Sequence, residues 1–269
     1  MNIFNGKEKA DFLDKQIIKY LSDHEPPGNL AIILIGNNPA SEKYVEIKRK
    51  YCDSRGIKCS VHKIDERLKD DDIFQKVISV LASPETGGVI IQLPLPRKSL
   101  DPCLRMIPAE KDIDAISPAS MDAFYSGHPR KILPVIRALE MFVKETGRDP
   151  NKEKLKAVVI GEGFLVGKPA AHFLRSIGYD VNVIVSYQRG QKIEADLLVL
   201  SAGVANLVRG EDISIGCDVV DFGSSIVEGK TVGDLDRESS SEHLGLVSFS
   251  PGGVGPLVVR FLIMNFLGI

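Results

Sequence analysis

The sequence lacks the features that would place the chain in a membrane, in an oxidising compartment or on nucleic acid. No apolar run approaches the roughly 18 residues that a membrane-spanning helix needs. Residues 1–7 lack the basic-then-apolar order of a signal peptide. The four cysteines form no Cys-x-x-Cys pair and no Cys/His cluster, which argues against a zinc site. A formal charge of −2 gives no electrostatic reason to bind nucleic acid. We therefore expect a cytoplasmic protein with free thiols and no bound metal.

The composition is that of an ordinary globular protein, and its apolar segments alternate between strand and helix patterns. The 269 residues are enough for one or two domains. The run 30–36 is apolar and ends in glycine, as a buried parallel strand does. A helix should follow, with Asn38 as its cap and Pro39 at its first position. Residues 88–93 predict a further strand.

The second half of the chain repeats this alternation after a polar linker at 147–154. The linker follows an amphipathic helix at 133–146. Strands are predicted at 157–161, 181–185, 197–201, 219–222 and 245–247. Strands that alternate with helices indicate a doubly wound parallel sheet, so we expect an α/β fold with a Rossmann-like dinucleotide-binding domain at 134–253. The first domain, 1–133, would be joined by an apolar C-terminal helix within 254–269.

A glycine-rich turn at 161–167 follows the first strand of the second domain and precedes a predicted helix. Glycine lets backbone amides approach a pyrophosphate, and a helix N-terminus favours its charge. The spacing is Gly-x-Gly-x-x-x-Gly, one residue longer than the usual dinucleotide fingerprint. An ordinary tight turn between a strand and a helix is the alternative interpretation.

Two features of this domain give opposite indications about the cofactor. An NAD site usually has an acidic residue at the end of the second strand, and none stands at 184–189. Ser186 and Arg189 would instead contact the 2′-phosphate of NADP. Glu162 would repel that phosphate and favours NAD. Arg189 is equally consistent with a solvated loop charge.

In the first domain a lysine, a tyrosine, an amide and a carboxylate suggest proton chemistry. Tyr44 and Lys48 lie four residues apart on the predicted helix, so they share a face. Gln92 ends a strand, and Asp114 lies in the loop 111–114. A lysine in a partly closed pocket has a lowered pKa and exchanges protons near neutral pH. A Tyr/Lys pair at this spacing is also common on solvated helix surfaces.

Six segments, in order along nearly the whole chain, resemble the bifunctional methylenetetrahydrofolate dehydrogenase/methenyltetrahydrofolate cyclohydrolase family. They are NPASEKYVEIKRK at 38–50, VIIQLPLP at 89–96, EKDID at 110–114, VGKP at 166–169, VGDLD at 232–236 and PGGVGP at 251–256. The resemblance implies two α/β domains flanking a cleft, usually in a homodimer. It also implies oxidation of 5,10-methylenetetrahydrofolate with NADP and hydrolysis of the methenyl product to 10-formyltetrahydrofolate.

The resemblance also assigns roles to residues of this chain. Lys48 would be the main catalytic group of the hydrolysis, and Gln92 would tune its proton affinity. Tyr44 would stack on the folate, and Asp114 would bind the pterin ring. Pro251, Gly252 and Gly253 would form a loop over the folate. The residues expected at the cofactor are Gly161, Gly163, Phe164, Leu165, Gly167, Ser186, Arg189, Ala202, Gly203 and Ser224.

The sequence departs from the family mainly in its cofactor motifs. The family's PCTP motif is KILP at 131–134, the phosphate-binding arginine of its glycine turn is absent, and its VGIN segment is FGSS at 222–225. Ala115 replaces a glycine after the second aspartate. Cyclohydrolase activity is therefore the firmer expectation, with dehydrogenase activity weakened or shifted towards NAD. Two other hypotheses are a non-catalytic folate-binding protein and an NAD(P) oxidoreductase acting on another substrate.

Overall fold

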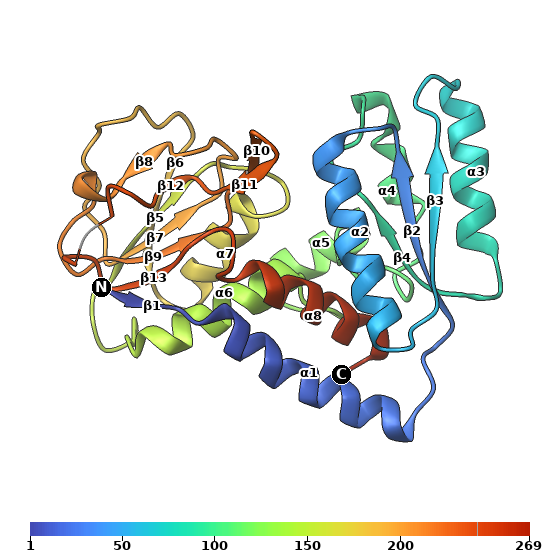
Figure 1. The fold of residues 1–269 in the computed structure, drawn as a ribbon, viewed down its shortest axis with the longest axis horizontal. Helices are drawn as coiled ribbons and strands as arrows, with labels where there is room; N and C mark the ends of the chain where they lie inside the picture. Colours follow the sequence, from blue (N-terminus) through green and yellow to red (C-terminus); the bar gives the residue numbers. More distant parts are fainter. Residues whose placement is uncertain (241) are drawn as a thin grey trace. The chain divides into compact units, whose positions relative to one another are not determined.

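The computed structural model describes residues 1–240 and 242–269, which form two compact units. The small-sheet unit contains Asp14–Pro134 and Val259–Ile269, and the large-sheet unit contains Met1–Leu13 and Val135–Val258. Each unit is a parallel α/β layer structure, as the alternating sequence pattern predicts (Figure 1). The division falls within two helices, α1 (Gly6–Asp23) and α8 (Gly255–Leu267), so each of them contributes to both units.

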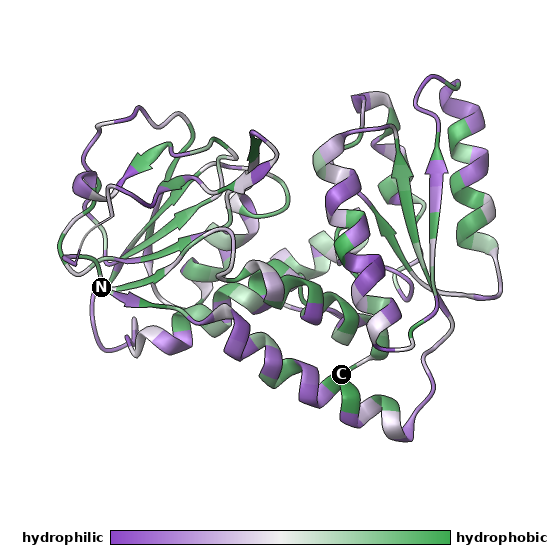
Figure 2. Ribbon diagram, in the orientation of Figure 1, coloured by the Kyte–Doolittle hydropathy of each residue, from purple (hydrophilic) through white to green (hydrophobic). Residues whose placement is uncertain are grey.

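The sheet of the small-sheet unit has three parallel strands in the order β3-β2-β4. The central strand β2 (Asn29–Ile35) is buried along its whole length, which explains its continuous apolar sequence. The neighbouring strand β4 (Thr86–Ile91) is also largely buried. The edge strand β3 (Cys59–Ile64) is half-buried and more polar, a difference that Figure 2 shows as a change of colour across the sheet.

Helix α2 (Pro39–Ser54) begins where the sequence predicts it. The side chain of Asn38 accepts a hydrogen bond from the backbone N–H of Ser41 at 3.0 Å, and Pro39 occupies the first turn. The cap and the proline fix the start of the helix, because each suits a position where backbone N–H groups have no helical partner. The helix therefore presents Tyr44 and Lys48 one turn apart on one face.

A buried ionic cluster joins three helices of the small-sheet unit. The carboxylate of Asp14, on α1, accepts hydrogen bonds from Tyr51 at 2.5 Å and from Arg260 at 3.0 Å, and it pairs with Arg55 at 2.9 Å. Both guanidinium groups also lie against the Tyr51 ring. Burial opposes ionisation of Asp14, but the bonds from Arg260 and Tyr51 outweigh it and lower its pKa. This cluster holds the C-terminal helix against α1 and α2.

Shorter elements complete the small-sheet unit. They are helix α3 (Asp70–Ala82), the 3₁₀ turn at Lys98–Leu100, α4 (Pro102–Arg105) and α5 (Pro118–Tyr125). A cluster of apolar side chains from α3, α4 and the strands β2 and β4 forms the core between them.

The large-sheet unit has six parallel strands in the order β1-β13-β9-β7-β5-β6. The strands are β1 (Asn2–Ile3), β5 (Lys156–Ile160), β6 (Asp180–Ile184), β7 (Leu197–Leu200), β9 (Asp218–Asp221) and β13 (Leu246–Ser248). Helices α6 (Pro134–Thr146) and α7 (Gly167–Ser176) belong to the same unit. The five strands predicted in the second half are present within one or two residues of their expected bounds.

The first 13 residues differ from the sequence expectation, which assigned them to the first domain. Strand β1 instead extends the six-stranded sheet, because Asn2 and Ile3 pair in register with Leu246 and Val247 of β13. Gly6 lies so close to Gly253 that a Cβ there would be 1.8 Å from its carbonyl oxygen. A two-residue strand carries no periodic pattern, so this pairing was invisible in the sequence.

Two small sheets in the large-sheet unit were also not predicted. Strands β10 (Ser225–Val227) and β11 (Lys230–Val232) form an antiparallel hairpin. Strand β8 (Val208–Arg209) pairs in parallel with β12 (Leu235–Asp236). Glu228 and Gly229 at the hairpin tip both have positive φ, 49° and 76°, as a tight two-residue turn requires.

Within residues 1–240 and 242–269, no helix is both long enough and apolar enough to span a membrane. The same residues contain no group of three or more His, Cys, Asp or Glu side chains arranged to hold a metal ion. The four cysteines are free thiols.

Candidate active site

The small-sheet unit brings Lys48 and Gln92 into direct contact. Lys48 donates a hydrogen bond from Nζ to Oε1 of Gln92 at 2.9 Å. The amide nitrogen of Gln92 donates to the carbonyl of Leu93 at 2.7 Å, which leaves the amide oxygen facing the lysine. Gln92 is only 8% exposed and follows directly after β4, so it is a rigid partner. The strand thus aims one acceptor at the lysine of α2.

The loop that carries Asp114 is held in place by backbone contacts on both sides. The carboxylate of Asp112, 1% exposed, accepts hydrogen bonds from the backbone N–H groups of Ile116 and Ser117. The side chain of Asn265, on α8, donates to the carbonyl of Ile113 at 2.9 Å. The two aspartates of the loop therefore differ, because Asp112 shapes the backbone while Asp114 interacts electrostatically with Lys48.

Burial and charge perturb both ionisable groups of this site. Burial lowers the pKa of the Lys48 ammonium below its ordinary 10.5, and the charge of Asp114 opposes part of that shift. Burial raises the pKa of Asp114; Lys48 counters this effect, and Asp112 adds to it. A lysine that releases its proton more readily than usual can act as a base and then as an acid.

Tyr44 lies one helical turn before Lys48, and it is 36% exposed. Its ring thus keeps an accessible face beside the lysine, as a residue that stacks on a planar ligand needs. The structure therefore brings together Lys48, Gln92 and Asp114 and sets Tyr44 on the same helix face.

The large-sheet unit contains a cavity of about 340 Å³ at the carboxyl ends of β5, β6 and β7. In parallel α/β sheets this is the edge at which ligands bind. The lining residues are Ile160, Gly161, Glu162, Gly163, Val185, Ser186, Tyr187, Ser201, Ala202, Val204 and Leu207. The cavity size and its apolar walls suit part of a dinucleotide.

Two of the three glycines in the turn at 161–167 are required by close packing. A Cβ on Gly161 would lie 2.7 Å from the carbonyl oxygen of Ser201, and φ is 96°. A Cβ on Gly167 would lie 2.1 Å from the carbonyl oxygen of Gly161. Gly163 has no neighbouring atom within 4 Å of that position. The turn runs from the cavity, which Gly161 and Gly163 line, to the N-terminus of α7 at Gly167, and backbone N–H groups at a helix N-terminus favour an anion such as pyrophosphate.

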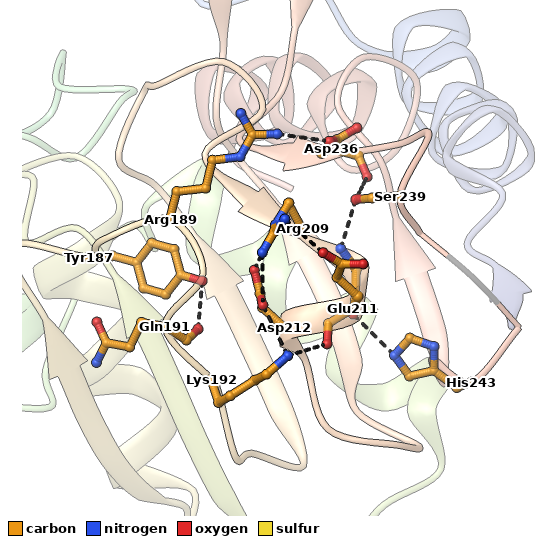
Figure 3. A network of polar contacts seen from close by, with 11 residues as sticks. Tyr187, Arg189, Gln191, Lys192, Arg209, Glu211, Asp212, Asp236, Ser239 and His243 are labelled. Carbon is orange, nitrogen blue, oxygen red and sulfur yellow. Dashed lines mark hydrogen bonds and ion pairs between the residues drawn. The ribbon is translucent and has the colours of Figure 1, made fainter.

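The basic groups near this cavity are paired with acidic groups in a polar network (Figure 3). Arg189 donates to Asp236 at 3.3 Å, and the Arg189 side chain is 56% exposed. Arg209 and Lys192 both contact Asp212. Among the described residues, the cavity lining contains no lysine or arginine, whereas it contains Glu162.

The structure divides the predicted cofactor residues into two groups. Gly161, Gly163, Ser186 and Ala202 line the cavity. The remaining predicted residues are not among the described residues of the lining: Phe164, Leu165, Gly167, Arg189, Gly203 and Ser224. Sequence reasoning overlooked Val185, Tyr187, Val204 and Leu207. In the sequence they stand one to seven residues after a strand. The loops that follow parallel strands lie at the same edge of the sheet, so this position could have indicated them.

The two glycines of the loop at 251–253 have different environments within the large-sheet unit. A Cβ on Gly253 would lie 2.1 Å from Oγ of Ser248, so internal packing already explains this glycine. Gly252 has φ of 102° and no atom within 4 Å of the added Cβ, so it permits a turn with an open backbone face.

Comparisons with known proteins agree with this geometry. Residues 4–114 match the model of the tetrahydrofolate dehydrogenase/cyclohydrolase catalytic domain, and residues 137–269 match that family's NAD(P)-binding domain. A curated relative, the bifunctional protein FolD of Halothermothrix orenii, is 31% identical over 271 residues, covering 98% of this chain and 95% of the relative.

Solved structures give the same result. The FolD methylenetetrahydrofolate dehydrogenase/cyclohydrolase of Campylobacter jejuni superposes with a TM-score of 0.85 at 30% identity, covering 100% of this chain and 98% of that one. The Trypanosoma brucei enzyme, solved with NADP cofactor and inhibitor, gives 0.87 at 25% identity, covering 98% and 95%. The chain belongs to the tetrahydrofolate dehydrogenase/cyclohydrolase family, and it is an enzyme of one-carbon metabolism with an NAD(P)-binding domain.

Proposed function

We propose that the chain oxidises 5,10-methylenetetrahydrofolate to 5,10-methenyltetrahydrofolate with NADP and hydrolyses the methenyl form to 10-formyltetrahydrofolate. The observation that carries this proposal is the hydrogen bond from Lys48 to Gln92, next to Asp114, in the unit that matches the family's catalytic domain. A protein that only bound folate would have no use for a desolvated lysine with a lowered pKa.

In the proposed hydrolysis, Lys48 manages the protons of an attacking water. The methenyl carbon is already electrophilic, so no metal is needed to activate it. Water adds to that carbon and loses one proton to the neutral amine of Lys48. Collapse of the adduct then breaks the bond from this carbon to N5. N5 takes the proton that the adduct hydroxyl gives up, which leaves the formyl group on N10 and releases one proton overall. Gln92 orients the amine throughout.

The folate itself would be held by groups that flank the lysine. Tyr44 would stack on a planar part of the substrate, and the carboxylate of Asp114 would accept hydrogen bonds from pterin N–H groups. Pro251, Gly252 and Gly253 would supply backbone contacts. The open backbone face of Gly252 supports this role.

For the oxidation, the cavity of the large-sheet unit would hold the dinucleotide. A bound nicotinamide supplies the hydride acceptor, so this chain contributes position rather than a reacting side chain. Gly161 and Gly163 line the cavity, and Gly167 begins helix α7, whose N-terminal N–H groups would bind the pyrophosphate. Phe164 and Leu165 lie in the same turn, while Ser186, Ala202, Gly203 and Ser224 lie after successive strands.

NADP is proposed over NAD because Arg189 can exchange partners. Its pair with Asp236 is long, at 3.3 Å, and exposed, and such surface pairs contribute at most about 1 kcal/mol. A 2′-phosphate is a stronger partner for a guanidinium group. Glu162 in the cavity lining works in the opposite direction. A hydrolase whose oxidation is weakened, or shifted to NAD, is therefore the second candidate function.

Three further features complete the proposal: oligomeric state, location and the division of roles along the chain. We propose a homodimer, supported by the exposure of Ile226 and Val227 on the hairpin β10–β11. A cytoplasmic location is consistent with four free thiols. We propose the folate-binding role for 1–133 with 254–269 and the dinucleotide-binding role for 134–253, with residues 1–13 and 254–258 packed into the large-sheet unit.

The test is an assay of both reactions on the purified chain. Methenyl hydrolysis is followed without any dinucleotide, and methylene oxidation is followed with NADP and, separately, with NAD. The variant Lys48→Ala should reduce hydrolysis by at least about 100-fold, the usual contribution of an acid–base group. Folate binding should change little.

Lys50→Ala is the matched control, because Lys50 lies on the same helix and is exposed. It should leave both rates near those of the unaltered protein. Normal hydrolysis by Lys48→Ala would overturn the role of the lysine. Hydrolysis without oxidation by either dinucleotide would select the second candidate function.

A further inference from the structure

The loop after β7 borders the cofactor cavity but is shaped from behind by one buried carboxylate. Ser201, Ala202 and Val204 line the cavity. The backbone N–H groups of Ala202 and Gly203 donate to Oδ2 of Asp234 at 2.6 and 3.0 Å, and that of Val204 donates to Oδ1 at 2.8 Å. Three consecutive amides therefore converge on a single side chain.

A second buried carboxylate holds Asp234 in turn. Oδ1 of Asp221 accepts from the backbone N–H groups of Gly223 at 2.7 Å and of Asp234 at 3.2 Å, and Oδ2 accepts from Leu235 at 3.0 Å. Asp221 ends β9, the strand beside β7 in the sheet. Asp234 and Asp221 are 0% and 2% exposed.

Two glycines lie close against the carboxylates and leave no room there for a side chain. A Cβ on Gly223 would lie 2.1 Å from Oδ1 of Asp234, and a Cβ on Gly233 would lie 2.0 Å from Oδ2 of Asp221. Gly223 is thus required by its packing against Asp234, and Gly233 by its packing against Asp221. The arrangement explains why acidic residues stand at these places, although neither lines the cavity among the described residues.

We propose that Asp234, supported by Asp221, is a positioning residue for dinucleotide binding, because its carboxylate fixes the backbone of residues 202–204 at the wall of the cavity. This inference rests on the proposed function of that cavity. Only a carboxylate suits the place, since both side-chain oxygens accept bonds. An asparagine has one acceptor oxygen and would turn an NH₂ group towards an N–H donor. The loop would have to shift to relieve that contact.

The test compares Asp234→Asn with Asp218→Asn in the full-length protein. Asp218 is a matched control, because it is 4% exposed at the other end of β9 and accepts from Leu246 at 2.6 Å and from Arg148 at 2.7 Å. The readouts are equilibrium titration with NADP and with NAD, the dinucleotide KM and kcat, and methenyl hydrolysis without dinucleotide.

Asp234→Asn should raise the dinucleotide Kd and KM at least about 10-fold, while hydrolysis stays within about twofold. Asp218→Asn should lower the melting temperature with an unchanged Kd. An unchanged Kd in folded Asp234→Asn, or an equal rise in both variants, would overturn the inference. If Asp234→Asn does not fold, Asp221→Asn replaces it, with a rise of several-fold expected and no rise overturning the inference.

The proposed function fails separately from this inference. If the unaltered protein binds neither NADP nor NAD, the assigned role of the cavity is wrong and the inference falls with it. If the unaltered protein binds a dinucleotide and the variants bind it equally well, only the positioning role of Asp234 is wrong.

Discussion

The two units build their sites from different kinds of atoms. In the small-sheet unit the proposed chemistry rests on the side chains of Lys48, Gln92 and Asp114. In the large-sheet unit the turn beside the cavity is shaped by close backbone approaches, because Gly161 and Gly167 have no room for a Cβ. The residues of the first site match the family motifs, whereas two motifs of the second, the glycine turn at 161–167 and FGSS at 222–225, depart from them.

A changed motif has different consequences at the two sites. A site made of side chains loses its chemistry when a residue type changes. A site made of backbone survives such changes as long as the close approaches remain, and here Gly161 and Gly167 preserve them. The altered motif therefore weakens the case for a particular dinucleotide more than the case for dinucleotide binding.

The largest expected effect comes from adding a methyl group at one of these two crowded glycines. Gly167→Ala places a methyl group 2.1 Å from the carbonyl oxygen of Gly161, so the turn must open. We expect dinucleotide-dependent oxidation to fall by about 100-fold, in line with other displacements of positioned groups. Steady-state kinetics with NADP and NAD would measure it, with methenyl hydrolysis as the internal reference.

Gly255→Ala is the control for that variant, because Gly255 is not among the described lining residues and no atom lies within 4 Å of its added Cβ. It should keep most of the activity. Equal losses in the two variants would mean that local packing does not decide which glycines matter.

The next effect concerns the pH dependence of hydrolysis. Gln92→Glu places a carboxylate against the ammonium of Lys48, which favours the charged amine and raises its pKa. The neutral amine is the proposed base, so activity should appear only at higher pH. At pH 7 the rate should fall by about 10-fold for each unit by which the pKa rises.

A pH–rate profile of hydrolysis for Gln92→Glu and the unaltered protein measures this shift. The acidic limb should move to higher pH in the variant, and Gln92→Met should lower the rate without adding a charge. Superimposable profiles would show that Gln92 does not tune the lysine.

A smaller effect is expected for the choice of dinucleotide. Arg189→Ala should lower kcat/KM with NADP by about 10-fold, the low end of the value of one charge-assisted hydrogen bond, and leave NAD unchanged. Arg175→Ala is the control, since Arg175 lies in the same unit and donates to the carbonyl of Val181. A loss shared equally by NADP and NAD would contradict contact with the 2′-phosphate.

The smallest effect concerns stability rather than either activity. Asn38→Ala removes the cap of α2 and should lower the free energy of unfolding by about 1 kcal/mol. Urea unfolding would measure it. Asn37→Ala, at the exposed neighbouring position, should have almost no effect. An equal loss in both variants would show that the cap bond contributes nothing.

The sequence predicted elements that have strong local patterns. The buried strand β2 and the start of α2 followed from a continuous apolar run, a capping asparagine and a proline. Strand β1 was missed, because two residues pair with β13 only through the tertiary fold. The hairpin β10–β11 was missed because glutamate is an unusual residue at a turn position with positive φ.

The site was predictable to a similar degree. The motifs indicated Lys48, Gln92 and Asp114. The structure adds that Asp112, in the same loop, accepts hydrogen bonds from two backbone N–H groups. The buried pair Asp221 and Asp234 was missed. Each follows or interrupts an apolar segment, but nothing in the sequence tells which amides a carboxylate will meet after folding.

The proposed hydrolysis depends most directly on the proton affinity of a single amine. Site-specific NMR titration of the Lys48 side chain, with labelled lysine and Lys48→Met for assignment, measures that affinity. We predict a pKa below the ordinary 10.5 that rises when Gln92 is replaced by glutamate. An ordinary pKa that is unaffected by Gln92→Glu would contradict the account.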